Sequence, residues 1–155
     1  MTTPKVLNQL IDQLKRREAQ EVIGDVLDLL PEMESLDVSG WPDLTEDGHN
    51  RTWESADLYA SEKLRLRLIC WKGGQSSSVH GHPGGGGLVK VMCGQLIETR
   101  YAPEEGSEEM DTWLMDVGSI GFIHDALAWH QIRNPHQTPA ISLHLYSMMP
   151  FGEFV

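Results

Sequence analysis

Three histidines in this chain could hold one metal ion. His80 and His82 flank Gly81, and His130 lies far downstream, shortly before Asn134. On a strand, side chains two residues apart point the same way and lie roughly 6–7 Å apart, so two imidazoles can bind one ion. A third imidazole from a distant strand can complete one side of the ion and leave other positions open for a substrate. This spacing predicts a metal-dependent enzyme.

The remaining sequence limits the setting of this site. The chain has 155 residues and a net charge of −11, and no apolar run approaches the ~20 residues that a membrane span needs. We therefore expect one domain, a monomer or small homo-oligomer, and no nucleic-acid or membrane partner. Cys70 and Cys93 lie in apolar runs and the N-terminus lacks a signal pattern, which favours reduced thiols and a cytoplasmic location.

Two kinds of hydrophobic periodicity divide the chain. From about residue 4 to residue 30 apolar side chains recur at helical spacing, which predicts a helical N-terminal region over about 1–38. Short alternating runs punctuated by Gly, Pro and Asp follow, which predicts an all-β sandwich or barrel over about 49–150. The clearest runs are 64–71, 88–93, 96–101, 112–115, 119–123 and 140–146. The glycines at 84–87 predict a tight turn, because no helix pattern follows them.

The order of these features resembles the cupin superfamily. Gly74, the histidine pair at 80–82 and Gly94 are similar to the first cupin motif, and His130 with Asn134 is similar to the second. The glutamate that usually follows the two histidines is absent, and glycines stand in its place. Three histidines without that carboxylate are typical of thiol dioxygenases.

Within that class the chain is similar to the cysteine dioxygenases, through segments 70–82, 94–99 and 139–147. The resemblance implies a mainly β fold, a cupin-type β-barrel (jelly roll) with N-terminal α-helices, forming a single cupin domain over 1–155. It also implies ferrous iron, Fe(2+), held by His80, His82 and His130. The implied reaction adds both atoms of O2 to the sulfur of a small carboxylated thiol, such as cysteine or 3-mercaptopropionate, and gives a sulfinic acid.

The donor atoms suit this chemistry. Three neutral imidazoles leave a divalent ion its full charge, which favours an anionic, soft thiolate and promotes loss of the thiol proton. Zinc has no accessible redox change, whereas ferrous iron can pass electrons to dioxygen. The residues therefore allow the reaction that the resemblance implies.

Ser142, His144 and Tyr146 occupy alternate positions of one expected strand and share a face. In cysteine dioxygenases the matching residues form a hydrogen-bonded relay, so the resemblance implies that Tyr146 donates to substrate or oxygen, His144 orients it and Ser142 holds His144. The alternative is that this polar row lies on the outer face of the barrel. Some family members link a cysteine to the relay tyrosine; that position here is Gly87, so we expect Tyr146 to be unmodified.

Substrate binding is assigned to Arg51, Arg67 and Trp71. The resemblance implies an arginine for the substrate carboxylate, and Arg51 is the nearest counterpart, although an insertion is needed to align it. Arg65 and Arg67 share a strand face with Trp71, whose family counterpart lines the pocket. Arginines there would suit an additional or differently placed carboxylate, as in mercaptosuccinate or mercaptopropionate. The alternative is an outer face that carries arginines.

Two other classes of protein fit the same motifs. A cupin isomerase or hydrolase would use a non-redox metal and a general base, and the missing carboxylate ligand counts against it. A cupin used as a ligand-binding module without a metal also fits, because fold does not fix function.

Overall fold

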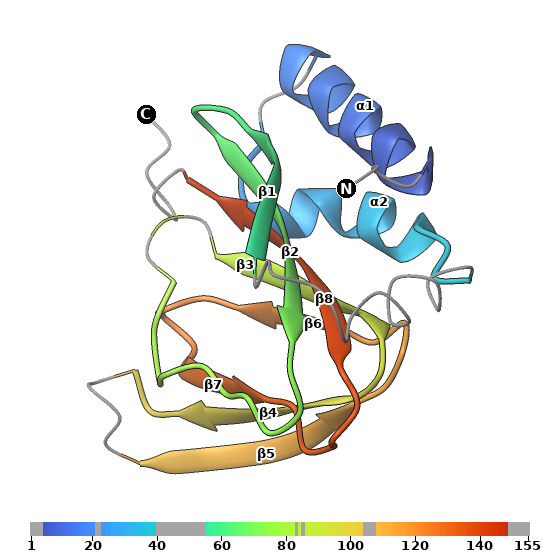
Figure 1. Ribbon diagram of the computed structural model, residues 1–155. Coiled ribbons are helices and arrows are strands. Elements are labelled where there is room, and N and C mark those ends of the chain that lie inside the picture. The colour runs from blue at the N-terminus through green and yellow to red at the C-terminus, as the bar shows by residue number, and fades with distance from the viewer. Residues whose placement is uncertain are drawn as a thin grey trace.

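Two antiparallel sheets face each other below a layer of helices (Figure 1). The structure is a computed structural model that describes residues 5–20, 23–39, 55–82, 84, 86–103 and 108–148. Within these residues, one sheet has the strand order β1-β2-β8-β3-β6 and the other has the order β5-β4-β7. The strands are β1 (Ser55–Ala60), β2 (Leu64–Trp71), β3 (Gly87–Cys93), β4 (Leu96–Tyr101), β5 (Glu109–Met115), β6 (Ile120–Ile123), β7 (Trp129–Arg133) and β8 (Ala140–Ser147). The mainly β fold with leading helices agrees with the expectation from the sequence.

The alternation along β2 separates two hydrophobic layers. Leu64, Leu66 and Leu68 are fully buried and pack in one cluster with residues of the helices. Trp71 belongs to a second cluster, between the two sheets, with Val89, Val91, Leu96, Met115, Ile132 and Ala140. The same parity holds on β8, where Ile141, Leu143 and Leu145 join the helix-facing cluster. Ser142, His144 and Tyr146 therefore face the interior between the sheets, and not the outer surface.

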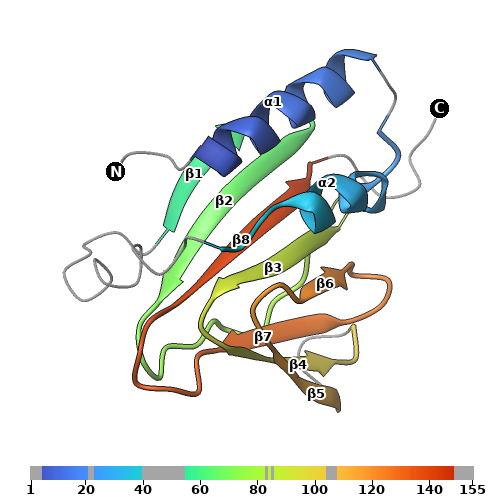
Figure 2. The same cartoon turned by 90° about the vertical axis from the view of Figure 1, so that its right-hand side faces the viewer.

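The N-terminal region differs in part from the expected helices. Helix α1 (Lys5–Gln20) lies along β1 and β2, as Figure 2 shows, and buries Leu7, Leu10 and Leu14. The second helical stretch, expected to continue to about residue 30, is instead a 3-10 turn, η1 (Val26–Leu29), followed by α2 (Leu30–Ser35). Asp25 explains the difference, because its carboxylate accepts from the Leu27 amide and starts a new turn there.

Two strands were not among the runs that the sequence pattern singled out. They are β1, which pairs with β2, and β7, which pairs with β4. Both are short and carry polar side chains, so their alternation is weak. In the described part of the chain, none of the helices is both long enough and apolar enough to cross a membrane.

Lys90 fastens α2 to the outer face of the larger sheet. It is 3% exposed, and its ammonium donates to the main-chain oxygens of Met33 at 2.6 Å and Leu36 at 2.7 Å. These carbonyls lie at the C-terminal end of α2, where helix oxygens lack partners within the helix and a positive charge is favoured. The buried charge is thus compensated by the helix end.

We expect Lys90→Met to lower the free energy of unfolding by about 2–4 kcal/mol, because it removes charged hydrogen bonds and leaves buried carbonyls without partners. Urea unfolding followed by circular dichroism measures this change. Lys5→Met is the matched control, since Lys5 is exposed at the start of α1, and should stay within about 0.5 kcal/mol of wild type. Equal stability of the two variants would show that Lys90 does not hold α2.

Candidate metal centre

The three histidines meet between the two sheets. His130 lies on β7 and is 1% exposed, while His80 and His82 lie in the connection from β2 to β3. The expectation that a regular strand carries both His80 and His82 is wrong. Only His80 is bridged, because its amide donates to the His130 carbonyl at 3.0 Å and its carbonyl accepts from the His130 amide at 2.9 Å. This main-chain pair fixes two of the three histidines against each other.

The imidazole nitrogens of these residues converge on one point. His130 Nε2 lies 3.1 Å from His80 Nε2 and 2.9 Å from His82 Nε2. One nitrogen from each ring lies within 4.8 Å of the other two, and in the described residues no carboxylate belongs to this group. Metal–nitrogen bonds of about 2.1 Å at right angles would place neighbouring nitrogens about 3.0 Å apart. The two short separations therefore suit ligands of one ion.

Hydrogen bonds at the far side of the rings set the direction of two lone pairs. His80 Nδ1 lies 2.8 Å from the Ser78 carbonyl oxygen, and His130 Nδ1 lies 2.8 Å from Glu98 Oε2. Both oxygens accept, so each Nδ1 carries the hydrogen and each Nε2 presents a lone pair. Two lone pairs 3.1 Å apart repel each other unless a positive charge lies between them. This arrangement is what a bound cation requires.

Burial keeps the histidine pair neutral. Loss of solvent lowers the pKa of His80, and it lowers the pKa of His82 to about 3, with a further contribution from the neighbouring imidazoles. Neutral imidazole is the form that binds a metal, so little proton release is needed at these two positions.

Gly81 has no space for a side chain. A Cβ atom there would collide with the carboxylate of Asp125 and the indole of Trp129. Asp125 comes this close because its carboxylate accepts from the main-chain amide of His82. Asp125, in the turn after β6, thereby holds in place the loop that carries His80 and His82.

Glu98 is a site residue that the sequence analysis did not single out. It lies on β4, is 1% exposed, and accepts from His130 Nδ1 at 2.8 Å and from Arg100 Nε at 3.0 Å. Burial acts to raise the pKa of Glu98, but the hydrogen bond from His130 and the charge of Arg100 outweigh it and lower the pKa. The carboxylate is therefore ionised and orients the His130 ring. A single acidic residue within the β4 run was the available signal.

We expect Glu98→Gln to weaken binding of a divalent metal about 10- to 100-fold, because an amide orients His130 less firmly and adds no negative charge behind it. Competition against a coloured metal chelator under nitrogen measures the affinity. Glu109→Gln, at an exposed position of β5, is the control and should bind the metal as wild type does. An unchanged affinity in Glu98→Gln would remove this role.

A hydrogen-bonded chain runs along β8 to the pocket. Trp71 Nε1 donates to Ser142 Oγ at 2.8 Å, Ser142 Oγ lies 2.7 Å from His144 Nε2, and Tyr146 Oη lies 2.9 Å from His144 Nδ1. Trp71 was assigned to substrate binding, and that role stays a prediction. Its side chain is buried behind Ser142 and is not among the residues that line the pocket, because Trp71 pairs with Ala140 at the far end of β8.

Trp71 sets the donor-to-acceptor direction of this series of hydrogen bonds. An indole N–H can only donate, so Ser142 accepts from Trp71, and among the described residues His144 Nε2 is the acceptor recorded for the Ser142 hydroxyl. His144 then carries its hydrogen on Nδ1 and donates to the Tyr146 oxygen. Burial lowers the pKa of His144 and raises the pKa of Tyr146 to about 12, so both are neutral near pH 7. The Tyr146 proton is left to point into the pocket.

Gly87 makes room for the Tyr146 ring. The two residues are register partners on β3 and β8, and a Cβ atom at Gly87 would lie 3.0 Å from Tyr146 Cδ1. Cys93, by contrast, pairs with Ile141 near the other end of β8, so it is not the residue beside Tyr146. The tyrosine ring also stacks on His82, with centroids 5.0 Å apart, which ties the relay to the histidine cluster.

A pocket of about 340 Å³ opens onto His80, His82 and Tyr146, and Arg65 and Arg67 lie in its wall. Arg67 pairs across the strands with His144, and Arg65 pairs with Tyr146. Of the residues assigned to the substrate that the structure describes, Arg67 lines this pocket and Trp71 does not. Arg51 lies outside the described residues.

Comparisons with solved structures agree with this architecture. A protein from Bacillus halodurans superposes with a TM-score of 0.57 at 14% identity, covering 68% of this chain and 77% of that one. A cupin domain from Schizosaccharomyces pombe superposes with a TM-score of 0.51 at 13% identity, covering 60% of this chain and 59% of that one. These likenesses show the fold, which is that of the cupins.

The sequence comparisons identify the family within this fold. The family model described as cysteine dioxygenase type I matches residues 1–154, and the chain belongs to this family. The human protein named cysteine dioxygenase type 1 is 29% identical over 150 residues, covering 93% of this chain and 75% of that protein. Family membership and the three-histidine cluster together fit a thiol dioxygenase with a metal cofactor.

Proposed function

We propose that this chain binds ferrous iron through His80, His82 and His130 and converts a small carboxylated thiol to its sulfinic acid. The observation that carries the proposal is the pair of Nε2 lone pairs facing each other at 3.1 Å, beside a pocket that a tyrosine hydroxyl and two arginines enter. The reaction balances without another reductant. One thiol and one O2 give one sulfinic acid, as sulfur loses four electrons and dioxygen gains them.

Iron, when bound, supplies the redox step between thiolate sulfur and dioxygen, which zinc could not supply. The chain's own residues supply position and protons. The neutral histidines leave the positive charge of the ion uncompensated, so an anionic thiolate is favoured over a neutral ligand. Tyr146 offers its proton at the pocket, held there by His144 and Ser142. The relay is thus directed at the developing negative charge on oxygen.

Arg67 is our candidate for the substrate carboxylate. Its Nε donates to Asp57 at 2.9 Å, and this hydrogen bond lowers the pKa of Asp57, which therefore stays ionised. The Nη groups of Arg67 are left to form the paired hydrogen bonds that a carboxylate accepts. Among the described residues that line the pocket none is acidic, so the amino group of cysteine has no anionic partner there. This favours thiol acids without an amine. A cytoplasmic location of the protein agrees with this function, because the cytoplasm keeps a thiol substrate reduced.

Oxygen uptake by the iron-loaded protein with a panel of thiols tests the proposal. We expect uptake with at least one of cysteine, 3-mercaptopropionate and mercaptosuccinate, with sulfinate formed in equal amount, and none with the zinc-loaded protein. Bound iron without uptake for any thiol acid would favour the isomerase, hydrolase or binding-module alternatives. Equal oxygen uptake by the zinc-loaded protein would contradict a role for iron in the redox step.

A further inference from the structure

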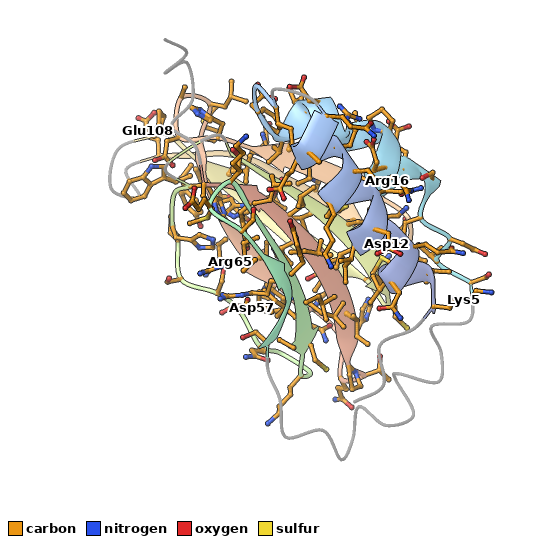
Figure 3. The ribbon with its side chains drawn as sticks, turned by 90° about the horizontal axis from the view of Figure 1, so that it is seen from above. Lys5, Asp12, Arg16, Asp57, Arg65 and Glu108 are labelled. Atoms are coloured by element: carbon orange, nitrogen blue, oxygen red, sulfur yellow. The ribbon has the colours of Figure 1, made fainter. Side chains whose placement is uncertain are left out.

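Two arginines, and not one, enter the pocket from β2. Arg65 and Arg67 stand two residues apart, so their side chains leave the same face of the strand, with Cα atoms about 6.5 Å apart. Both line the pocket together with His80, His82 and Tyr146. Figure 3 shows Arg65, and Asp57 on the neighbouring strand, on the side of the β1–β2 hairpin away from α1.

The charge of the described pocket lining is opposite in sign to that of the chain. The sequence holds 23 acidic and 12 basic residues, yet the described lining of this pocket holds two arginines and no acidic residue. Arg67 has Asp57 as its partner, whereas none of the described carboxylates lies within ion-pair distance of Arg65. The charges of both arginines and of Asp57 act on the Tyr146 hydroxyl, so the Arg67–Asp57 pair and Arg65 all lie near the end of the relay, with one positive charge in excess. An acidic protein that gathers cations at this point is suited to bind a dianion.

We propose that the substrate of this site is a thiol with two carboxylates on a short chain, one bound by Arg67 and the other by Arg65. This inference rests on the proposed function, because it assumes that the thiol occupies the histidine centre. The pocket, at about 340 Å³, has room for a four-carbon thiol diacid beside that centre. Each arginine offers a planar pair of N–H donors that matches one carboxylate. Arg65 is then a specificity-determining residue, which separates diacids from monoacids.

The test compares mercaptosuccinate with 3-mercaptopropionate on wild type, Arg65→Gln and Arg67→Gln. Dissociation constants come from calorimetry of the iron-loaded protein under nitrogen, and kcat/KM comes from oxygen uptake. We expect wild type to bind mercaptosuccinate at least about tenfold more tightly than 3-mercaptopropionate, since one more charge-assisted hydrogen-bond pair forms. Arg65→Gln should reduce this ratio at least about fivefold, because the loss falls on the diacid. Arg16→Gln, exposed on α1, is the control and should keep the wild-type ratio.

The outcomes separate this inference from the proposed function. Equal or weaker binding of mercaptosuccinate by wild type, or an Arg65→Gln variant that weakens both thiols equally, overturns the assignment of Arg65 even if sulfinate forms from 3-mercaptopropionate. Tighter binding of mercaptosuccinate that depends on Arg65, without oxygen uptake, supports diacid binding and contradicts the dioxygenase reaction. Circular dichroism spectra matching wild type show that the variants are folded.

Discussion

The His130→Ala protein is expected to lose the proposed iron binding and the proposed thiol oxidation together. His130 Nε2 is the nitrogen closest to both other candidate ligands, at 3.1 Å from His80 and 2.9 Å from His82, so its removal leaves two imidazoles without the third that closes the site. We expect bound iron to fall from about one ion per chain to near zero. Turnover should fall at least about 1000-fold, since a bound metal lowers the activation free energy by several kcal/mol. Elemental analysis and oxygen uptake measure the two effects.

His130 is buried against Glu98, so its loss also costs stability, and a second variant separates the two effects. His80→Ala removes a less buried ring that contacts a main-chain carbonyl, and it should lose iron without loss of the fold. His136→Ala is the control, because His136 is exposed and its ring contacts Gln95 instead of the cluster. Full iron content in a folded His80→Ala protein would contradict the three-histidine site.

The Tyr146→Phe protein is expected to keep its iron and lose about 100-fold in kcat. The phenol is the end of the chain from Trp71 through Ser142 and His144, and its proton is the one group of that chain aimed at the pocket. A positioned proton donor typically contributes about 10²–10⁴-fold. Phenylalanine keeps the ring that stacks on His82, so iron binding should be unchanged.

The pH profile adds a second measurement on Tyr146. Burial raises its pKa to about 12, so the proton is held in the folded protein throughout the neutral and mildly alkaline range and is lost only above that value. We therefore expect no alkaline fall of kcat from this tyrosine up to about pH 10. Tyr59→Phe, on β1 and paired with Glu18 of α1, is the control for loss of a phenol away from the pocket. Full turnover by Tyr146→Phe would exclude the proton-donor role.

Patterns of local spacing were sufficient for the parts of the fold that depend on alternation. The run at 64–71 placed Arg65, Arg67 and Trp71 on one face, and β2 keeps that parity. The run at 140–146 likewise placed Ser142, His144 and Tyr146 together, and the burial of the intervening apolar residues under the helices shows which face is inward. The roles assigned to these residues stay predictions.

Features that depend on pairing between distant strands could not be read from the sequence. Glu98 reaches His130 only because Arg100 pairs with His130 across β4 and β7, which places Glu98 one step along on the same face. Trp71 lies on the expected face of β2, but its register partner on β8 is Ala140, which places it away from the described pocket lining. The turn at Asp25 was missed because apolar spacing continued through it, while a side-chain cap redirected the chain.

Isotope labelling of the product tests the central claim most directly. The iron-loaded protein, supplied with ¹⁸O2 and a carboxylated thiol, should give a sulfinic acid in which both oxygen atoms on sulfur carry the label, and the metal-free and His80→Ala proteins should give none. Sulfinate labelled from water, or oxygen reduced to peroxide while the thiol becomes a disulfide, would contradict a dioxygenase reaction at the three histidines.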